Sequence, residues 1–299
     1  DEAAQTLADG VAEDLLDRLG QVPRMRVVAR TSSFAFREQA DDVKRIGRAL
    51  GVAWVLEGSV RTDGQRLVIG AQLVDTRTGF VAWSTRLERP LADLFAVQDE
   101  ISRAVALQVM QRIDPGIELP EAHRSAGVQA WQEFMLAREL FSRRTQDWRP
   151  AARAALQRAL ALEPDFARAL ALRAIVDLLE AEHTPQREAL HEAARAGVQR
   201  ALAVDPGLGL AHAALGLLHL QRDEWAAADA ALSRALEFDP QLAAAANWRH
   251  IALNSLGRRD EAQAVLERAL QLDPLNPTLR GNMAAAHERE GRDALARQE

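Results

Sequence analysis

Few residues of this chain are placed for acid–base or nucleophilic chemistry. His212 and His219 share a helical face at i,i+7, which is too long for the i,i+4 pair that binds zinc. The segment 30–36 has two serines beside aromatic residues, but no histidine occurs before His123 to act as their base. Because no nucleophile is paired with a base, we expect no catalytic residues.

Acidic and glycine-containing segments also favour structural roles. The clustered carboxylates are Glu13, Asp14 and Asp17, with a further pair at 41–42. Such groups are common in first turns and on solvated helix faces, so a metal or acid–base role is the weaker reading. The glycines of segment 46–51 end a predicted helix and precede a strand, the reverse of a phosphate-binding turn, and helix capping explains them. The chain has no cysteine, and we expect neither a metal nor a cofactor.

The composition indicates an ordered, soluble chain. Of its 299 residues, 48% are apolar and 27% charged, and this length suits two domains or one domain with a repeat array. The net charge of −6 comes from interspersed acidic and basic residues, so we expect no direct nucleic-acid binding. No apolar run is long enough to span a bilayer, and we expect no membrane insertion. Because the sequence starts at Asp1 and ends inside a helical pattern, we expect a piece of a longer protein.

Proline after an acidic residue recurs through the second half, at 164, 206, 240 and 274, with spacings of 42, 34 and 34 residues. Twelve, eight and five places before each proline the residues are small, large and small. The four sets are Ala152, Leu156 and Ala159; Ala194, Val198 and Ala201; Ala228, Leu232 and Ala235; and Ala262, Leu266 and Ala269. Offsets of three and four lie on one helical face, and proline ends a helix. The pattern predicts helices that pack closely in pairs.

A 34-residue period of paired helices with this alanine and proline pattern resembles the tetratricopeptide repeat. Segment 210–240 is nearly a full unit, with Asp223 where such units usually carry a turn glycine, as Gly257 does. The eight extra residues of the 42-residue spacing fit the turn around 183–186. Within an array at 125–299, the predicted units are 130–164, 165–206, 207–240, 241–274 and a partial unit at 275–299. The resemblance implies a curved groove for a protein or peptide partner.

One unit differs from its neighbour on its first helix. A shift of 34 places Asn247, Trp248, Arg249, His250 and Asn254 over Ala213, Ala214, Leu215, Gly216 and Leu220. A histidine in place of glycine conflicts with close helix packing, and such local conflicts mark functional sites. Amide, arginine and aromatic side chains suit recognition of a peptide or carboxylate. These five residues are our candidate partner-binding site; the alternative is a degenerate repeat in which Trp248 fills its own core.

Residues 1–112 have another pattern. Helical periodicity covers 5–19 and 41–50, with a β-branched run at 25–30 between them. Segment 53–89 alternates apolar and polar residues and is interrupted at 63–64 and 78–79 by turn residues, which predicts a three-stranded meander. Its tryptophans, Trp54 and Trp83, are expected in the core. A helix from about 91 to 112 and a linker at 113–124 follow. The predicted fold class is α+β: a small mixed α/β domain, then an all-α superhelix.

Residues 1–112 resemble the TolB-like amino-terminal domain of bacterial multidomain regulatory proteins. The resemblance is carried by segments 7–19, 26–37, 46–61, 71–83 and 93–105. In that family an apolar strand precedes the first helix. Here it would lie before Asp1, which would leave a sheet edge open for a homodimer. Family members, and the similar CadC-type activators, combine such domains with helical repeats and an output domain such as a winged helix, a nucleotide cyclase or a kinase.

The sequence therefore predicts a non-enzymatic, signal-sensing interaction module of a bacterial regulatory protein. Its compartment stays open between the cytoplasm and the periplasmic side of a membrane-anchored regulator. Two alternatives remain: an enzyme with a site between its domains, and a periplasmic envelope-assembly factor.

Overall fold

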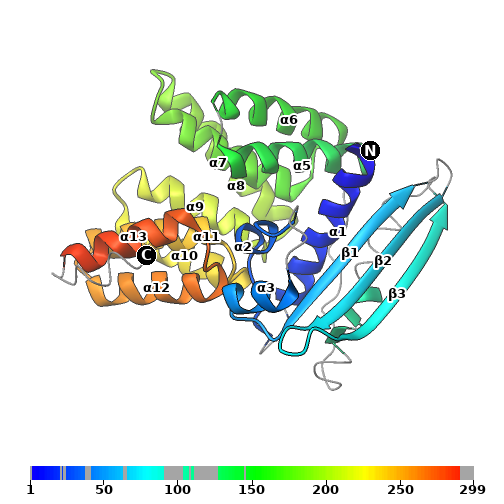
Figure 1. Ribbon diagram of the computed structural model, residues 1–299. Helices are drawn as coiled ribbons and strands as arrows, with labels where there is room; N and C mark the ends of the chain where they lie inside the picture. Colours follow the sequence, from blue (N-terminus) through cyan, green and yellow to red (C-terminus); the bar gives the residue numbers. More distant parts are fainter. Residues whose placement is uncertain are drawn as a thin grey trace. The chain divides into compact units, whose positions relative to one another are not determined.

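The computed structural model describes residues 2–20, 22, 25–37, 42–62, 66–90, 104–107, 109–110, 127–144 and 146–289. The chain divides into two compact units. The first is Asp1–Ser125 with Asp273–Leu275, and the second is Ala126–Leu272 with Asn276–Glu299. Figure 1 labels the elements of both.

Three antiparallel strands form the sheet of the first unit in the order β1-β2-β3. They are β1 (Trp54–Thr62), β2 (Arg66–Asp75) and β3 (Val81–Pro90). At the β2–β3 turn, the Asp75 carboxylate accepts hydrogen bonds from the backbone nitrogens of Arg77 at 2.8 Å and Thr78 at 3.2 Å. Gly79 then takes the left-handed conformation, with φ of +78°, that its place in the turn requires. The meander predicted from alternation is therefore confirmed.

The sheet shares its core with helical segments that precede and follow it in the chain. The helices that precede it are α1 (Glu2–Gly20), α2 (Arg30–Phe34) and α3 (Val43–Leu50). Alternate residues of β2, namely Leu67, Ile69 and Leu73, pack with apolar residues of α1 and of the segment 105–110, and both tryptophans of the sheet join this core. Residues 25–29 have no regular secondary structure. The turn predicted at 63–64, the linker at 113–124 and most of the helix predicted at 91–112 lie outside the described residues.

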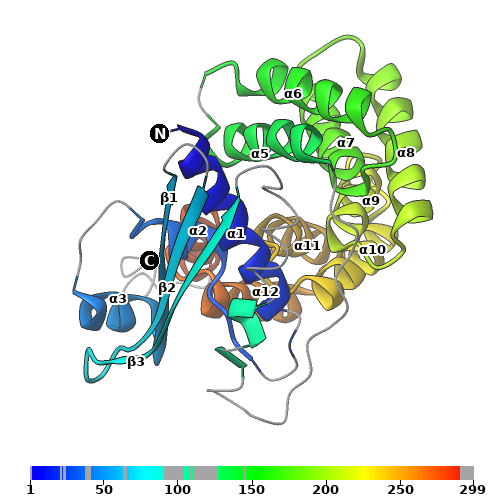
Figure 2. The same cartoon turned by 90° about the vertical axis from the view of Figure 1, so that its right-hand side faces the viewer.

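The second unit is built from helices that pack as consecutive hairpins. They are α5 (Val128–Arg143), α6 (Trp148–Leu162), α7 (Ala167–Ala181), α8 (Arg187–Val204), α9 (Gly209–Leu220), α10 (Trp225–Phe238), α11 (Ala243–Ser255), α12 (Arg259–Leu272) and α13 (Pro277–Arg289). Figure 2 shows α5 to α12 following one another around an arc. Within the described residues no strand follows β3. The predicted fold class, a small α/β domain followed by an all-α superhelix, is confirmed.

The small-large-small pattern forms the contact between paired helices. All twelve of its residues are buried, and in α10 the residues Ala228, Leu232 and Ala235 are fully so. The alanines allow the partner helix to approach, and the larger residue fills the space between them. The recurring proline follows each of these second helices.

Two turns of the array show how the repeat tolerates sequence change. Asp223 adopts φ of +61° and Gly257, its equivalent one repeat later, φ of +76°. Aspartate is among the few residues other than glycine that tolerate this conformation. In the longer repeat, α7 has 15 residues against 12 in α9, and α8 has 18 against 14 in α10. Three of the eight extra residues thus extend α7, four extend α8 and one lengthens the turn between them, so the insertion lies around the predicted turn and mostly takes helical form.

Candidate functional site

Helix α9 is the equivalent of α11 in the preceding repeat, and its packed face is made of small residues. Gly216 lies against the partner helix so closely that an added Cβ would overlap Leu232. Ala213 and Ala214 are fully buried beside it. This face of α9 therefore has no room for polar side chains.

His250 occupies the place of Gly216 in α11, and its ring is buried inside the hairpin, 6% exposed. Its Nδ1 donates to the carbonyl oxygen of Ala262 on α12 at 3.2 Å, and its Nε2 lies 3.0 Å from the amide nitrogen of Asn254. A carbonyl can only accept, so Nδ1 carries the proton and Nε2 accepts. Burial lowers the pKa of His250; the Ala262 bond opposes this and the charge of Arg289 adds to it. The imidazole is thus a neutral link between α11 and α12.

The two asparagines of the predicted site have different partners. Asn254 donates to the backbone carbonyl of His250 at 3.0 Å as well as to its ring, so it stays on its own helix. Asn247 accepts a hydrogen bond from the side-chain amide of Asn282 on α13. Asn247 and Asn254 are both half-buried. The structure thus brings His250 and Asn254 together against α12, whereas Asn247 has a separate contact with α13.

Trp248 points into the core and Arg249 into an ionic network. Trp248 is 6% exposed and packs in the same apolar cluster as Leu217 and Leu232. Arg249 Nε donates to Asp229 Oδ1 on α10 at 2.7 Å. Trp248 is therefore placed to hold the hairpins together, as the degenerate-repeat alternative supposed.

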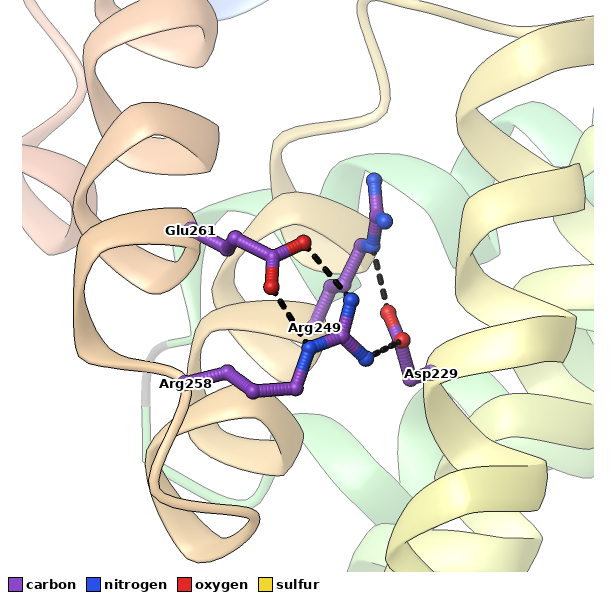
Figure 3. Close-up of polar contacts among 4 residues, drawn as sticks. All are labelled: Asp229, Arg249, Arg258 and Glu261. Carbon is purple, nitrogen blue, oxygen red and sulfur yellow. Dashed lines mark hydrogen bonds and ion pairs between the residues drawn. The ribbon is translucent and has the colours of Figure 1, made fainter.

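The ionic network joins three helices at one edge of α11. Asp229 lies between two arginines, and its second oxygen accepts from Arg258 Nη1 at 2.6 Å (Figure 3). Arg258 also donates two hydrogen bonds to the Glu261 carboxylate, from Nε to Oε1 at 2.7 Å and from Nη2 to Oε2 at 2.6 Å. These bonds lower the pKa of Glu261 and raise that of Arg258. Asp229 is mostly buried, so the network fixes the junction of α10, α11 and the start of α12.

The outward face of α11 includes exposed apolar residues that were not part of the site predicted by comparing the repeats with one another. Ile251 is 39% exposed and lies between Asn247 and Asn254 in the helical order, and Leu256 is exposed just after the helix. The repeat spacing relates this network to an earlier one. Asp229 lies 76 residues after Arg153, and Arg249 lies 76 residues after Arg173; 76 is the sum of one 42-residue and one 34-residue spacing. Arg153 and Arg173 also meet across two neighbouring repeats, through Asp177.

Other candidate groups have structural partners. Glu13 is buried and pairs with Arg30. Asp42 caps α3 by accepting from the backbone nitrogen of Lys44 at 3.0 Å, and Gly51 ends that helix with φ of +66°, which confirms the capping role. Side chains of Asp14 and Asp17, and the whole of Asp41, lie outside the described part of the chain.

His212 and His219, which the sequence places seven residues apart, also have structural partners. His212 stacks on Phe238 and bonds the carbonyl oxygen of Pro206 at 2.9 Å. His219 bonds Glu224, whose pKa is lowered chiefly by that contact. The described residues contain no group of three or more histidine, cysteine or acidic side chains suited to a metal ion. None of the helices in this part of the chain is long and apolar enough to cross a membrane.

Comparisons with known proteins bear most directly on the helical repeats. The family model described as "Tetratricopeptide repeat" matches residues 252–274. A protein of Rhizobium meliloti (strain 1021), named "Putative adenylate cyclase 3", is 35% identical over 174 residues, covering 58% of this chain and 30% of that protein. The chain thus spans less than a third of this relative's length.

Similar solved structures include two bacterial proteins. One is a thermophilic tetratricopeptide-repeat protein of Thermus thermophilus, with a TM-score of 0.46 and 22% identity over 56% of this chain and 86% of that one. Another is Pseudomonas aeruginosa pilF, with a TM-score of 0.44 and 20% identity over 57% of this chain and 72% of that one. The assignment of tetratricopeptide repeats rests on the family model and on the paired helices themselves. Arrays of this kind act as protein-interaction modules.

Proposed function

We propose that this chain is the interaction and signal-sensing part of a bacterial regulatory protein, and that a protein or peptide partner binds along α11. The observation that carries this proposal is the surface of α11, where exposed Ile251 lies between two half-buried asparagines. An apolar contact flanked by amide groups suits a peptide, whose backbone needs hydrogen bonds and whose side chains need apolar area.

The regulatory setting draws on the first unit. In this proposal residues 1–112 are a TolB-like domain that connects the repeats to an output domain. The name of the Rhizobium relative supports a nucleotide cyclase as that output. Because the match covers only 30% of the relative, we place catalysis in a part of such proteins separate from the matched one.

The same name favours a second candidate, in which this chain itself forms cyclic AMP. Incubation of the purified chain with ATP and Mg²⁺ or Mn²⁺, followed by measurement of cyclic AMP, separates the two. We expect no product above a heat-denatured control. Turnover that scales with the concentration of the chain would establish the enzyme instead.

A peptide-display selection on the immobilised chain tests the binding proposal. We expect enriched peptides whose Kd, measured by fluorescence anisotropy, rises about tenfold or more on Ile251→Glu, because a charge replaces an apolar contact. Leu162→Glu makes the same change at another exposed apolar residue, on α6 (52% exposed against 39% for Ile251), and as the matched control it should leave the Kd unchanged. Failure to enrich any peptide, or equal effects of both changes, would contradict a site on α11.

A further inference from the structure

Two arginines that the α11 site does not involve lie where α5 meets α6: Arg144 ends α5, and Arg149 is in the first turn of α6. Arg144 ends α5 with φ of +45°, and its guanidinium lies 5.0 Å from the ring centre of Phe141 and 5.9 Å from that of Trp148. Arg149 lies 5.3 Å from the same tryptophan ring. Trp148 is buried and meets Phe141 edge-on at 5.5 Å. The aromatic pair therefore holds both guanidinium groups in place.

The buried acid of this region is already occupied by other arginines. Asp177 of α7 accepts from Arg153 Nε at 2.9 Å and from Arg173 Nε at 3.0 Å. A second carboxylate, Glu180, has its oxygen 4.0 Å from Arg149 Nε, which is too long for a hydrogen bond. Asp147, which precedes α6, is exposed.

Arg149 has an unsatisfied donor next to a second cation, Arg144. The Nε of Arg149 is buried and has no hydrogen-bond partner. The pKa of Arg144 is lowered, first by burial and then by the positive charge of Arg149. Arg144 is exposed and the Arg149 side chain is 33% exposed, so solvent reaches both residues. Two adjacent cations repel each other, and an anion between them would relieve both the repulsion and the unsatisfied donor.

We propose that Arg144 and Arg149 form an oxyanion-binding site that accepts a phosphate or carboxylate group carried by a peptide of a partner protein. Guanidinium groups donate paired hydrogen bonds in a plane that matches both oxyanions. The peptide source rests on the proposed function, whereas the oxyanion site stands on its own residues. It uses α5 and α6 and shares no residue with the α11 surface.

Inorganic phosphate is the first probe. The full chain is titrated with phosphate in a calorimeter, at constant ionic strength and with chloride as the competing anion. This titration should show saturable binding. Arg144→Gln and Arg149→Gln should each raise the Kd about tenfold or more, since each removes a charge-assisted donor. Arg158→Gln is the matched control: it lies on the same helix, but its charge is paired with Glu133 at 2.7 Å. Arg149→Lys, which keeps the charge and loses the fork, should fall between.

Circular dichroism of each variant checks that the fold persists. If one glutamine variant unfolds, the other and Arg149→Lys still decide the question. No saturable phosphate binding by the unchanged chain, or equal weakening by Arg158→Gln, overturns the proposal.

Three peptides of one neutral host sequence, carrying phosphoserine, glutamate or serine at the centre, then identify the source of the oxyanion. Tighter binding of the first than the second, lost in Arg149→Gln, assigns phosphate; equal binding of both assigns carboxylate. Binding of all three alike overturns the peptide part of the proposal. Retained phosphate binding with no effect of Ile251→Glu on any peptide would instead reject the α11 site alone.

Discussion

At the scale of single residues, His250 shows how a polar group enters the close contact between repeat helices. Its ring lies at the position that Gly216 has in α9, and it donates a hydrogen bond to the backbone carbonyl of Ala262 on the facing helix. Its burial separates His250 from Asn247 and Asn254, which are both half-buried.

We expect His250→Ala to lower the free energy of unfolding by about 1–3 kcal/mol, because the Ala262 carbonyl loses its donor inside the hairpin. Ile251→Ala, the next residue and an exposed one, should change it by less than about 0.5 kcal/mol. Urea denaturation of both variants measures the difference. Equal effects would show that the His250 bond contributes nothing to the hairpin.

The lowered pKa of His250 gives a pH dependence with a definite sign. Its folded pKa lies below the value of 6.5 taken for the free group, so between the two the unfolded chain binds more protons. Stability is therefore full above that value and falls as the pH drops through it. The loss between pH 7.5 and 5.5 should be smaller in His250→Asn, which keeps a polar group but does not titrate. Identical pH profiles in urea denaturation would contradict this.

At the scale of elements, close helix contact depends on glycine at one position and not at another. A Cβ added at Gly216 would overlap Leu232. A Cβ added at Gly281 would meet no atom within 4 Å. We expect Gly216→Ala to destabilise the chain by about 1–3 kcal/mol through overpacking. Gly281→Ala on α13 should stabilise it by up to about 1 kcal/mol, through helix propensity. Thermal denaturation followed by circular dichroism compares the pair, and destabilisation by both would refute the packing argument.

The elements themselves were largely predictable, because local patterns encode them. The alanine and leucine spacing gave the paired helices, and Thr78-Gly79 gave the β2–β3 turn. The partners of the candidate site were not predictable in this way. Asn282 and Ala262 reach Asn247 and His250 from other helices, whose relative rotation no local period specifies. Ile251 escaped selection because one exposed apolar residue on a helix is ordinary.

At the scale of the whole molecule, the edges of the sheet determine where a second copy of the chain can pair. Among the described residues β1 and β3 are the edges of the sheet. Exposed Arg86 and Glu88 and the terminal Pro90 give β3 the features that discourage pairing at an edge. On β1, Gly58 and Ser59 in the middle of the strand are exposed and neutral, and the exposed charge of Arg61 lies near its end. If the sheet recruits a second copy, β1 is the better edge.

We therefore predict concentration-dependent dimerisation through β1. Ser59→Lys should abolish it, because a charge on the edge must be desolvated when a second strand pairs there. Ser84→Lys makes the same change at an exposed position of β3 and should leave the dimer intact. Sedimentation velocity over a wide concentration range, with circular dichroism as a check of fold, measures both variants. A monomer at every concentration would contradict self-association, and loss of the dimer only in Ser84→Lys would move the interface to β3.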